Sequence, residues 1–178
     1  MLIEETPIEG AYVITIEKKE DERGFFARAF CRNEFEAAGL ATDLVQANVS
    51  FNYKKGTLRG MHMQLPPRGE TKLVRCTRGA IYDVVADVRE GSGTFKRWFG
   101  LELTSQNHRM LYVPEGCAHG YITLEDETEV MYQVSQFYTA SAERGYRWDD
   151  PAFNIKWPIP PEIISAKDKS HPFLSKAL

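Results

Sequence analysis

The 178-residue chain is long enough for one domain with a substantial core, and its 43% hydrophobic and 26% charged residues are ordinary for a globular protein. A formal net charge of −3 excludes a global electrostatic attraction to nucleic acid or to an anionic membrane. We therefore expect any anionic ligand to be held by a local cluster of Arg and Lys side chains.

The sequence gives no sign of export or of membrane insertion. The N-terminus is acidic almost at once, and charged residues interrupt the most apolar region. Three cysteines, Cys31, Cys76 and Cys117, are odd in number and show no CxxC spacing. Free thiols in a reducing compartment explain them best, so we expect a cytoplasmic protein that binds neither membrane nor nucleic acid.

Short runs rich in Val, Ile, Leu and Tyr, bounded by Gly and Pro, predict an all-β protein. In chain order, the segment Asn33–Ala38 predicts a short helix that ends at Gly39. The expected strands are Ala11–Ile16, Lys72–Thr77, Ile81–Val88, Arg97–Leu103, Met110–Val113 and Glu129–Ser135. In the last strand, Val130, Tyr132 and Val134 should share one face, and the alternating residues Glu129, Met131 and Gln133 should share the other.

Many short strands at near-regular spacing favour a β-sandwich or barrel. After Trp148 the composition changes, and four prolines predict an irregular C-terminal tail. The chain contains no internal repeat and no linker-like segment, so we expect residues 1–178 to form a single domain.

A histidine motif suggests a barrel of the cupin type. The segment Pro114–His119 has the form PxGxxH, which resembles the second cupin motif. Metal-binding cupins carry two histidines separated by one residue upstream, but here His62 is followed by Gln64. An amide is a poor substitute for imidazole at a borderline metal, even with Glu70 nearby. We therefore expect no metal and no cofactor, which leaves His62 available for proton chemistry.

From about residue 8 to residue 172 the chain resembles the dTDP-4-dehydrorhamnose 3,5-epimerase family. The matching stretches are Asp21–Phe26, Gln46–Asn48, Leu58–Gln64, Lys72–Arg75, Asp83–Arg89, Pro114–Gly120, Tyr132, Tyr138 and Ser165–Asp168. This resemblance implies a cupin-type double-stranded β-helix, a jelly-roll barrel with short peripheral helices.

The resemblance also implies an epimerase that inverts C3, C5 or both in a nucleotide-linked 4-keto-6-deoxyhexose. A C–H beside a ketone loses its proton only when the enolate oxygen is stabilised, so the site needs a base, a stabiliser and an acid. By resemblance, His62 is the base and Tyr132 the acid on the opposite face. Asp168 would orient the imidazole of His62, and Lys72 would stabilise the enolate.

The remaining family positions would bind the substrate. Arg23 and Arg59 match positions that hold phosphate, which suits the planar fork of arginine. Residues that match positions near the sugar, the nucleotide or the pocket rim are Phe26, Arg28, Gln46, Asn48, His119, Tyr138, Glu143 and Lys167. The resemblance implies a homodimer in which the Arg23–Phe26 strand serves the pocket of the neighbouring subunit.

Several points stay open at the level of sequence. Strict strand alternation would place Arg59 and His62 on opposite faces, unless Gly60 forms a bulge or Arg59 acts across a subunit boundary. Arg28 and Met63 depart from the family's glutamate and aromatic residue, which leaves substrate identity and the number of inverted centres undecided. The alternatives are a single-centre epimerase, a metal-dependent cupin and a non-catalytic sugar-binding domain.

Overall fold

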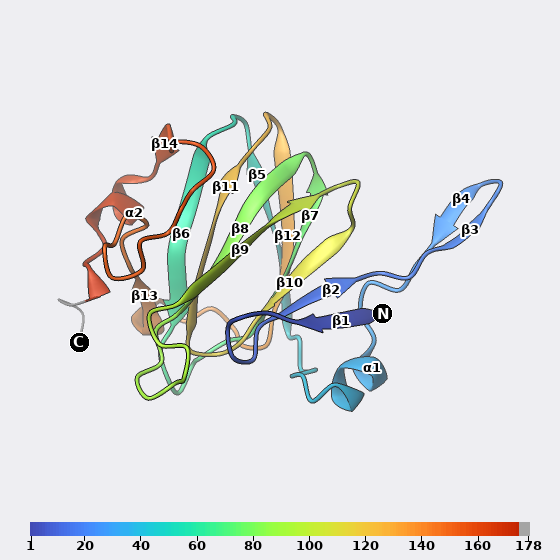
Figure 1. Ribbon diagram of the computed structural model, residues 1–178, viewed down its shortest axis with the longest axis horizontal. Coiled ribbons are helices and arrows are strands. Elements are labelled where there is room, and N and C mark those ends of the chain that lie inside the picture. The colour runs from blue at the N-terminus through green and yellow to red at the C-terminus, as the bar shows by residue number, and fades with distance from the viewer. Residues whose placement is uncertain (175–178) are drawn as a thin grey trace.

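The computed structural model describes residues 1–174, which form two large sheets packed face to face and one small hairpin (Figure 1). The first sheet runs in the order β1 (Leu2–Glu5), β2 (Tyr12–Thr15), β10 (Arg109–Val113), β7 (Lys72–Arg78), β12 (Thr128–Val134) and β5 (Gln46–Asn52). The second runs in the order β13 (Glu143–Gly145), β6 (Thr57–Gln64), β11 (Cys117–Thr123), β8 (Ala80–Asp87) and β9 (Trp98–Thr104). The short strand β14 (Ile163–Ile164) pairs with β6 in parallel.

The all-β prediction is confirmed, and each of the six expected strands matches an observed strand to within one residue at either end. The expected helix corresponds to α1 (Arg32–Ala37). The tail is less irregular than expected, because it contains β14 and the helix α2 (Ala166–Ser170). Ser165 caps α2 by accepting a hydrogen bond from the backbone N–H of Asp168, which satisfies one of the free N–H groups at the start of the helix. Within residues 1–174, no helix is long and apolar enough to cross a membrane.

The hydrophobic core lies between the two sheets, where β7, β10 and β12 face β8, β9 and β11. Val74, Val85 and Leu111 are fully buried there. Burying one such side chain stabilises the fold by roughly 1.5–3 kcal/mol. A second cluster forms where the C-terminal segment covers the outer face of the second sheet, with Phe153 packed near Met61. The tail is thereby attached along β6.

Strand β5 has the inverse of the usual pattern of an amphipathic strand. Its inward-facing residues are polar, namely Gln46, Asn48, Ser50 and Asn52. Its outward-facing residues include Val49, which is 65% exposed, and Phe51. Polar side chains that point into a barrel need a cavity or polar partners there. The sequence pattern of β5 therefore marks the wall of a polar cavity.

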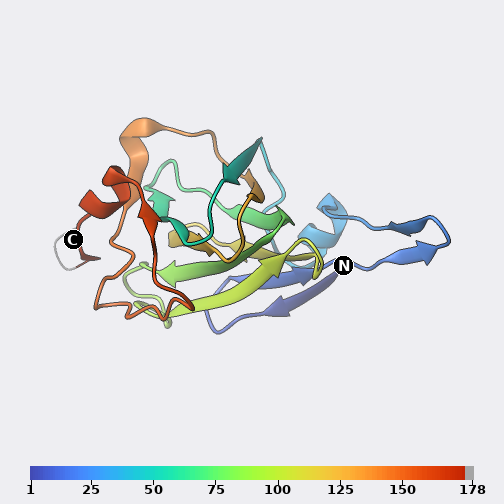
Figure 2. The same ribbon diagram turned by 90° about the horizontal axis from the view of Figure 1, so that it is seen from above.

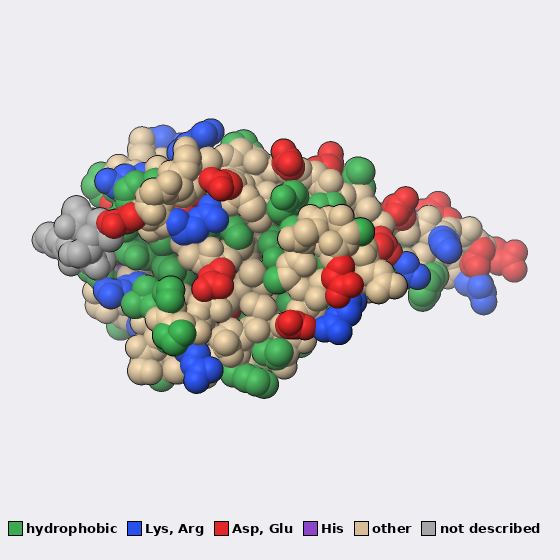
Figure 3. Space-filling view, turned by 90° about the horizontal axis from the view of Figure 1, so that it is seen from below, with side chains coloured by type: hydrophobic (Ala, Val, Ile, Leu, Met, Phe, Trp, Pro, Cys, Tyr) green, Lys and Arg blue, Asp and Glu red, His purple; other side chains and the backbone are tan. Residues whose placement is uncertain are grey.

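A two-stranded hairpin of β3 (Lys19–Asp21) and β4 (Gly24–Phe26) extends away from the barrel in both perpendicular views (Figures 1 and 2). Phe26 is 71% exposed at its edge. On the face seen from below, acidic and basic side chains are interspersed, and the hairpin carries both kinds (Figure 3). Within one chain, the hairpin leaves its aromatic residues exposed to solvent.

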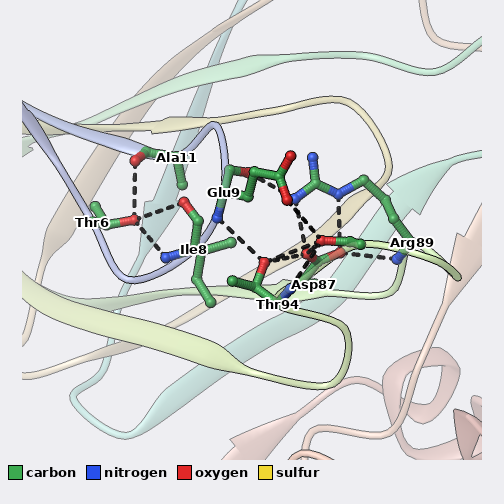
Figure 4. A network of polar contacts seen from close by, with 8 residues as sticks. Thr6, Ile8, Glu9, Ala11, Asp87, Arg89 and Thr94 are labelled. Atoms are coloured by element: carbon green, nitrogen blue, oxygen red, sulfur yellow. Dashed lines mark hydrogen bonds and ion pairs between the residues drawn. The ribbon is translucent and has the colours of Figure 1, made fainter.

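A buried carboxylate closes the loop between β8 and β9 (Figure 4). Asp87 accepts hydrogen bonds from Arg89, Ser92 and Thr94, and Arg89 also donates to the carbonyl of Glu9 at 2.7 Å. Burial opposes ionisation of Asp87, but these donors outweigh it and lower its pKa to about 2. The ionised carboxylate therefore ties the N-terminal loop to the second sheet.

Candidate active site

A cavity of about 350 Å³ opens where β5 and β7 begin and where β6 and β12 end. It continues into an inner chamber of about 190 Å³. His62, Lys72 and Tyr132 line both volumes. The other lining residues are Gln46, Asn48, Ser50, Arg59, Met63, Gln64, Glu70, His119, Tyr121, Val134, Tyr138 and Glu143. Most of the residues predicted from sequence are thus brought together in one place.

A bulge in β6 resolves the difficulty over Arg59 and His62. His62 pairs with His119 of β11 and Arg59 pairs with Tyr121, so three steps on β6 match two steps on β11. The extra residue lies around Gly60, whose φ is 133°, a value that L side chains rarely adopt. Both Arg59 and His62 consequently face the inner chamber of the same chain.

His62 and Asp168 form the predicted pair. His62 Nε2 lies 2.7 Å from Asp168 Oδ1, and the other carboxylate oxygen accepts from the Gly60 N–H at 3.3 Å. Burial alone would raise the pKa of Asp168, but the hydrogen bond with His62 outweighs it and lowers this pKa. An ionised carboxylate only accepts hydrogen bonds, so His62 Nε2 carries a proton and Nδ1 is left as the basic nitrogen.

Lys72 and Tyr132 provide a positive charge and a proton donor. Lys72 Nζ is 3.2 Å from Glu70 and 3.4 Å from the His62 carbonyl oxygen, and its side chain is only 9% exposed. Burial, and then the carboxylate of Glu70, raises the pKa of Tyr132, although Arg59 opposes this. Tyr132 therefore keeps its hydroxyl proton at neutral pH.

Two supporting residues were missed by the sequence reasoning. Arg59 Nε donates to Asn52 Oδ1 at 2.8 Å, and His119 Nε2 lies 2.7 Å from the fully buried Asp83. Asn52 continues the polar alternation of β5, and Asp83 is a charged residue flanked by the apolar residues of β8, so the sequence does mark both positions. They fix the orientation of two side chains in the inner chamber.

At the mouth, three predicted binding residues are linked to one another. Tyr138 donates to Glu143 at 3.0 Å, and Lys167 donates to the other oxygen of Glu143 at 2.5 Å. The hydrogen bond from Lys167 lowers the pKa of Glu143. Lys167 does not line the main cavity; it connects α2 to β13 through this ion pair.

Gln64 occupies the position of the second cupin histidine, and its amide makes structural hydrogen bonds. Its Nε2 donates to Glu70 at 3.2 Å and to the Phe137 carbonyl, while its Oε1 accepts from the Thr139 N–H at 2.6 Å. Across the same cavity, Gln46 donates to Asn48, and both of these residues belong to β5. Gln64 thus supports the loop that follows β12.

The hairpin residues lie outside the cavity of their own chain. Arg23 pairs with Asp21 and its side chain is 84% exposed, like that of the neighbouring Phe26. Arg28 also lies outside the cavity of its own chain, where it donates to Glu34 of α1 at 2.7 Å, so its place at the pocket rim stays a prediction. Met63 lines the cavity but is only 6% exposed, because most of its side chain packs in the cluster under the C-terminal segment.

The model of the family described as dTDP-4-dehydrorhamnose 3,5-epimerase matches residues 5–176. A relative of that name from Shigella flexneri is 46% identical over 149 residues, which are 83% of this chain and 82% of the relative. The chain belongs to this family. It is therefore an isomerase of the 3,5-epimerase class, as predicted from the sequence.

Solved structures of epimerases confirm the cupin-type fold. The enzyme from Bacillus anthracis, solved with TDP and pyrophosphate bound, is 41% identical and superposes with a TM-score of 0.93 over 97% of this chain and 98% of its own. The epimerase from Legionella pneumophila, in complex with dTDP-4-keto-L-rhamnose, is 34% identical with a TM-score of 0.91 over 98% and 93% of the two chains. The two-sheet architecture is thus that of the 3,5-epimerases.

The bulge in this epimerase yields a first testable prediction. A Cβ added at Gly60 would lie 2.6 Å from the Gly120 Cα, and the positive φ adds strain. We expect Gly60→Ala to destabilise the fold by roughly 2–4 kcal/mol and to impair activity in whatever protein still folds. Gly93→Ala is the control, since a Cβ there meets only Glu9 at 3.9 Å. If the two variants unfolded at the same urea concentration, β6 would tolerate a side chain at position 60, and the bulge would not depend on glycine.

Proposed function

We propose that this family member moves protons on the two carbons that flank the C4 ketone of a dTDP-linked 4-keto-6-deoxyhexose, with His62 as base and Tyr132 as acid. One observation carries the assignment: His62 comes from β6 of one sheet and Tyr132 from β12 of the other, and both line the same cavity. A sugar ring held between the sheets has the two groups on opposite faces. Inversion of a centre requires this arrangement, because the proton must leave from one face and return to the other.

Proton removal is the first step. His62 Nδ1 accepts the proton from the carbon beside the ketone, and the C–H electron pair moves into the ring to give an enolate with its charge on the C4 oxygen. Asp168, 2.7 Å from Nε2, stabilises the imidazolium that forms. Such general-base assistance is typically worth about 10²–10⁴-fold in rate.

The buried ammonium of Lys72 stabilises the enolate oxygen. Lys72 is held by Glu70 in the wall shared by both chambers, so its charge is in place before the reaction begins. A preorganised charge in a site that excludes water stabilises a developing anion far more than the same charge in solvent. Tyr132 then donates its hydroxyl proton to the opposite face of the carbon.

The rest of the cavity fits a nucleoside diphosphate. Arg59, oriented by Asn52, places guanidinium donors in the inner chamber beside the base, and the ring of His119, oriented by Asp83, lines the same chamber. Gln46 and Asn48 present amides nearer the mouth, and Tyr138 offers an exposed ring there. The TDP-bound and dTDP-sugar-bound relatives support a dTDP-linked substrate for this chain.

We further propose that two copies associate and share their sites. The outward face of β5 and β12 carries exposed apolar side chains, with Val49 opposite Met131 and Phe51 nearby on β5, each at least 37% exposed in one chain. Covering such a patch favours association. The extended hairpin would then bring Arg23 and Phe26 of one subunit to the cavity of the other, which gives these exposed residues a function.

The assignment of the acid is tested by Tyr132→Phe, which removes one hydroxyl and little volume. We expect the variant to keep exchanging substrate hydrogen with D₂O, because deprotonation uses His62, while inverted product falls by about 10²-fold or more. Mass spectrometry and NMR of the sugar measure the two quantities separately. Tyr82→Phe, at a residue outside the cavity, is the matched control. Undiminished inversion in Tyr132→Phe would assign the acid to another group.

Shared sites are tested with purified mixed dimers that carry two different affinity tags. Pairing a His62→Ala subunit with an Arg23→Ala subunit leaves one complete site if Arg23 acts in the neighbouring subunit, so we expect about half of the wild-type kcat. Pairing the double variant with wild type damages both sites and should give little activity. The reverse outcome, with activity only in the second pairing, would show that Arg23 serves its own chain.

A further inference from the structure

A second histidine lies against the pair formed by His62 and Asp168. His171 follows Asp168 by three residues at the end of α2, and its Nε2 is 3.5 Å from Asp168 Oδ1. Its ring packs edge to face on that of His62, with centroids 5.6 Å apart and an angle of 80° between the planes. One donor atom from each of the three residues lies within 4.8 Å of the others.

The fold makes specific room for this ring. A Cβ at Gly145 would overlap the His171 imidazole, so only glycine fits there while the ring keeps its place. Gly145 in β13 is itself the residue paired with His62 in β6. His171 is therefore held against the same backbone that positions the base, and its side chain is only 12% exposed.

The surroundings determine which tautomer His171 adopts. Burial, followed by the positive charge that His62 carries when protonated, lowers the pKa of His171, which favours the neutral ring. The other charged groups that face it are Asp168 and Lys167 on α2 and Glu143 on β13. Its Nε2 is buried and forms no hydrogen bond in the part of the chain that the structure describes. The Asp168 oxygen, at 3.5 Å, is the carboxylate atom nearby but does not meet the geometry of a hydrogen bond. A lone pair directed at a carboxylate would be repelled, so Nε2 carries the hydrogen and is directed at Asp168.

We propose that His171 is a positioning residue whose Nε2–H, directed at Asp168 Oδ1 from 3.5 Å without a full hydrogen bond, limits how strongly that carboxylate holds the His62 proton. The inference rests on the proposed role of His62 as base. With His171, the carboxylate of Asp168 faces three donors, the others being His62 and the Gly60 N–H. Without the other two donors, Asp168 would stabilise the protonated ring of His62 more strongly. Less of His62 would then be present as the neutral base at neutral pH.

The experiment compares His171→Phe, which keeps a ring without a donor, with His171→Gln, which keeps an N–H donor. NMR of labelled histidine follows the titration of His62 in the free full-length protein, and kcat/KM is measured against pH. In His171→Phe we expect the His62 midpoint and the acidic limb of kcat/KM to move up by roughly half to one pH unit. On the acidic side this corresponds to a roughly three- to tenfold loss of rate. In His171→Gln both should stay near wild type.

A second variant covers the case in which His171→Phe does not fold. Gly145→Ala keeps His171 but displaces its ring, and should move the His62 midpoint in the same direction. An unchanged midpoint in the folded variants, or equal shifts in the Phe and Gln proteins, would overturn the proposal. The NMR titration gives this answer whether or not the protein epimerises its substrate, so failure of the proposed function remains a separate result.

Discussion

The site depends on one buried hydrogen bond, between His62 in the barrel wall and Asp168 in the C-terminal helix, at 2.7 Å and 106 residues apart in the chain. For it to form, the tail must cross the outer face of the second sheet and start α2 at the right position, which the Ser165 cap ensures. The bulge at Gly60 must also turn His62 toward the cavity and present an N–H to the same carboxylate. The position of the tail and the orientation of the base therefore depend on each other.

A second constraint follows from placing the reaction between two sheets. Residues that reach a substrate from both faces must project inward from strands that would otherwise be filled with apolar side chains, and β5 shows the consequence. Its polar residues line the cavity and its apolar residues, such as Val49, face outward. The core is displaced toward the opposite part of the barrel, around Val85 and Leu111. The exposed apolar surface is the one that we propose a second copy covers, so the polar cavity wall and the proposed interface belong to the same strand.

Much of the fold could be predicted from sequence because strands with one buried face repeat at period two, as Val130, Tyr132 and Val134 do. Strands such as β5 and β6 escaped this pattern, the first because its inward face is polar and the second because Gly60 breaks the alternation. The pairing of His62 with Asp168 followed only from the family resemblance, since no local rule connects residues so distant in the chain. His171 carried no recognisable pattern, because its place depends on the missing side chain of Gly145.

The central claim is that His62 removes the proton beside the ketone. The most direct measurement is the deuterium gained by a dTDP-linked 4-keto-6-deoxyhexose in D₂O, compared between wild type and a folded His62→Ala variant. We expect exchange at both carbons that flank the ketone with the wild-type protein, and no enzyme-dependent exchange with His62→Ala. Exchange by His62→Ala at the wild-type rate would contradict the account and assign the base elsewhere in the cavity.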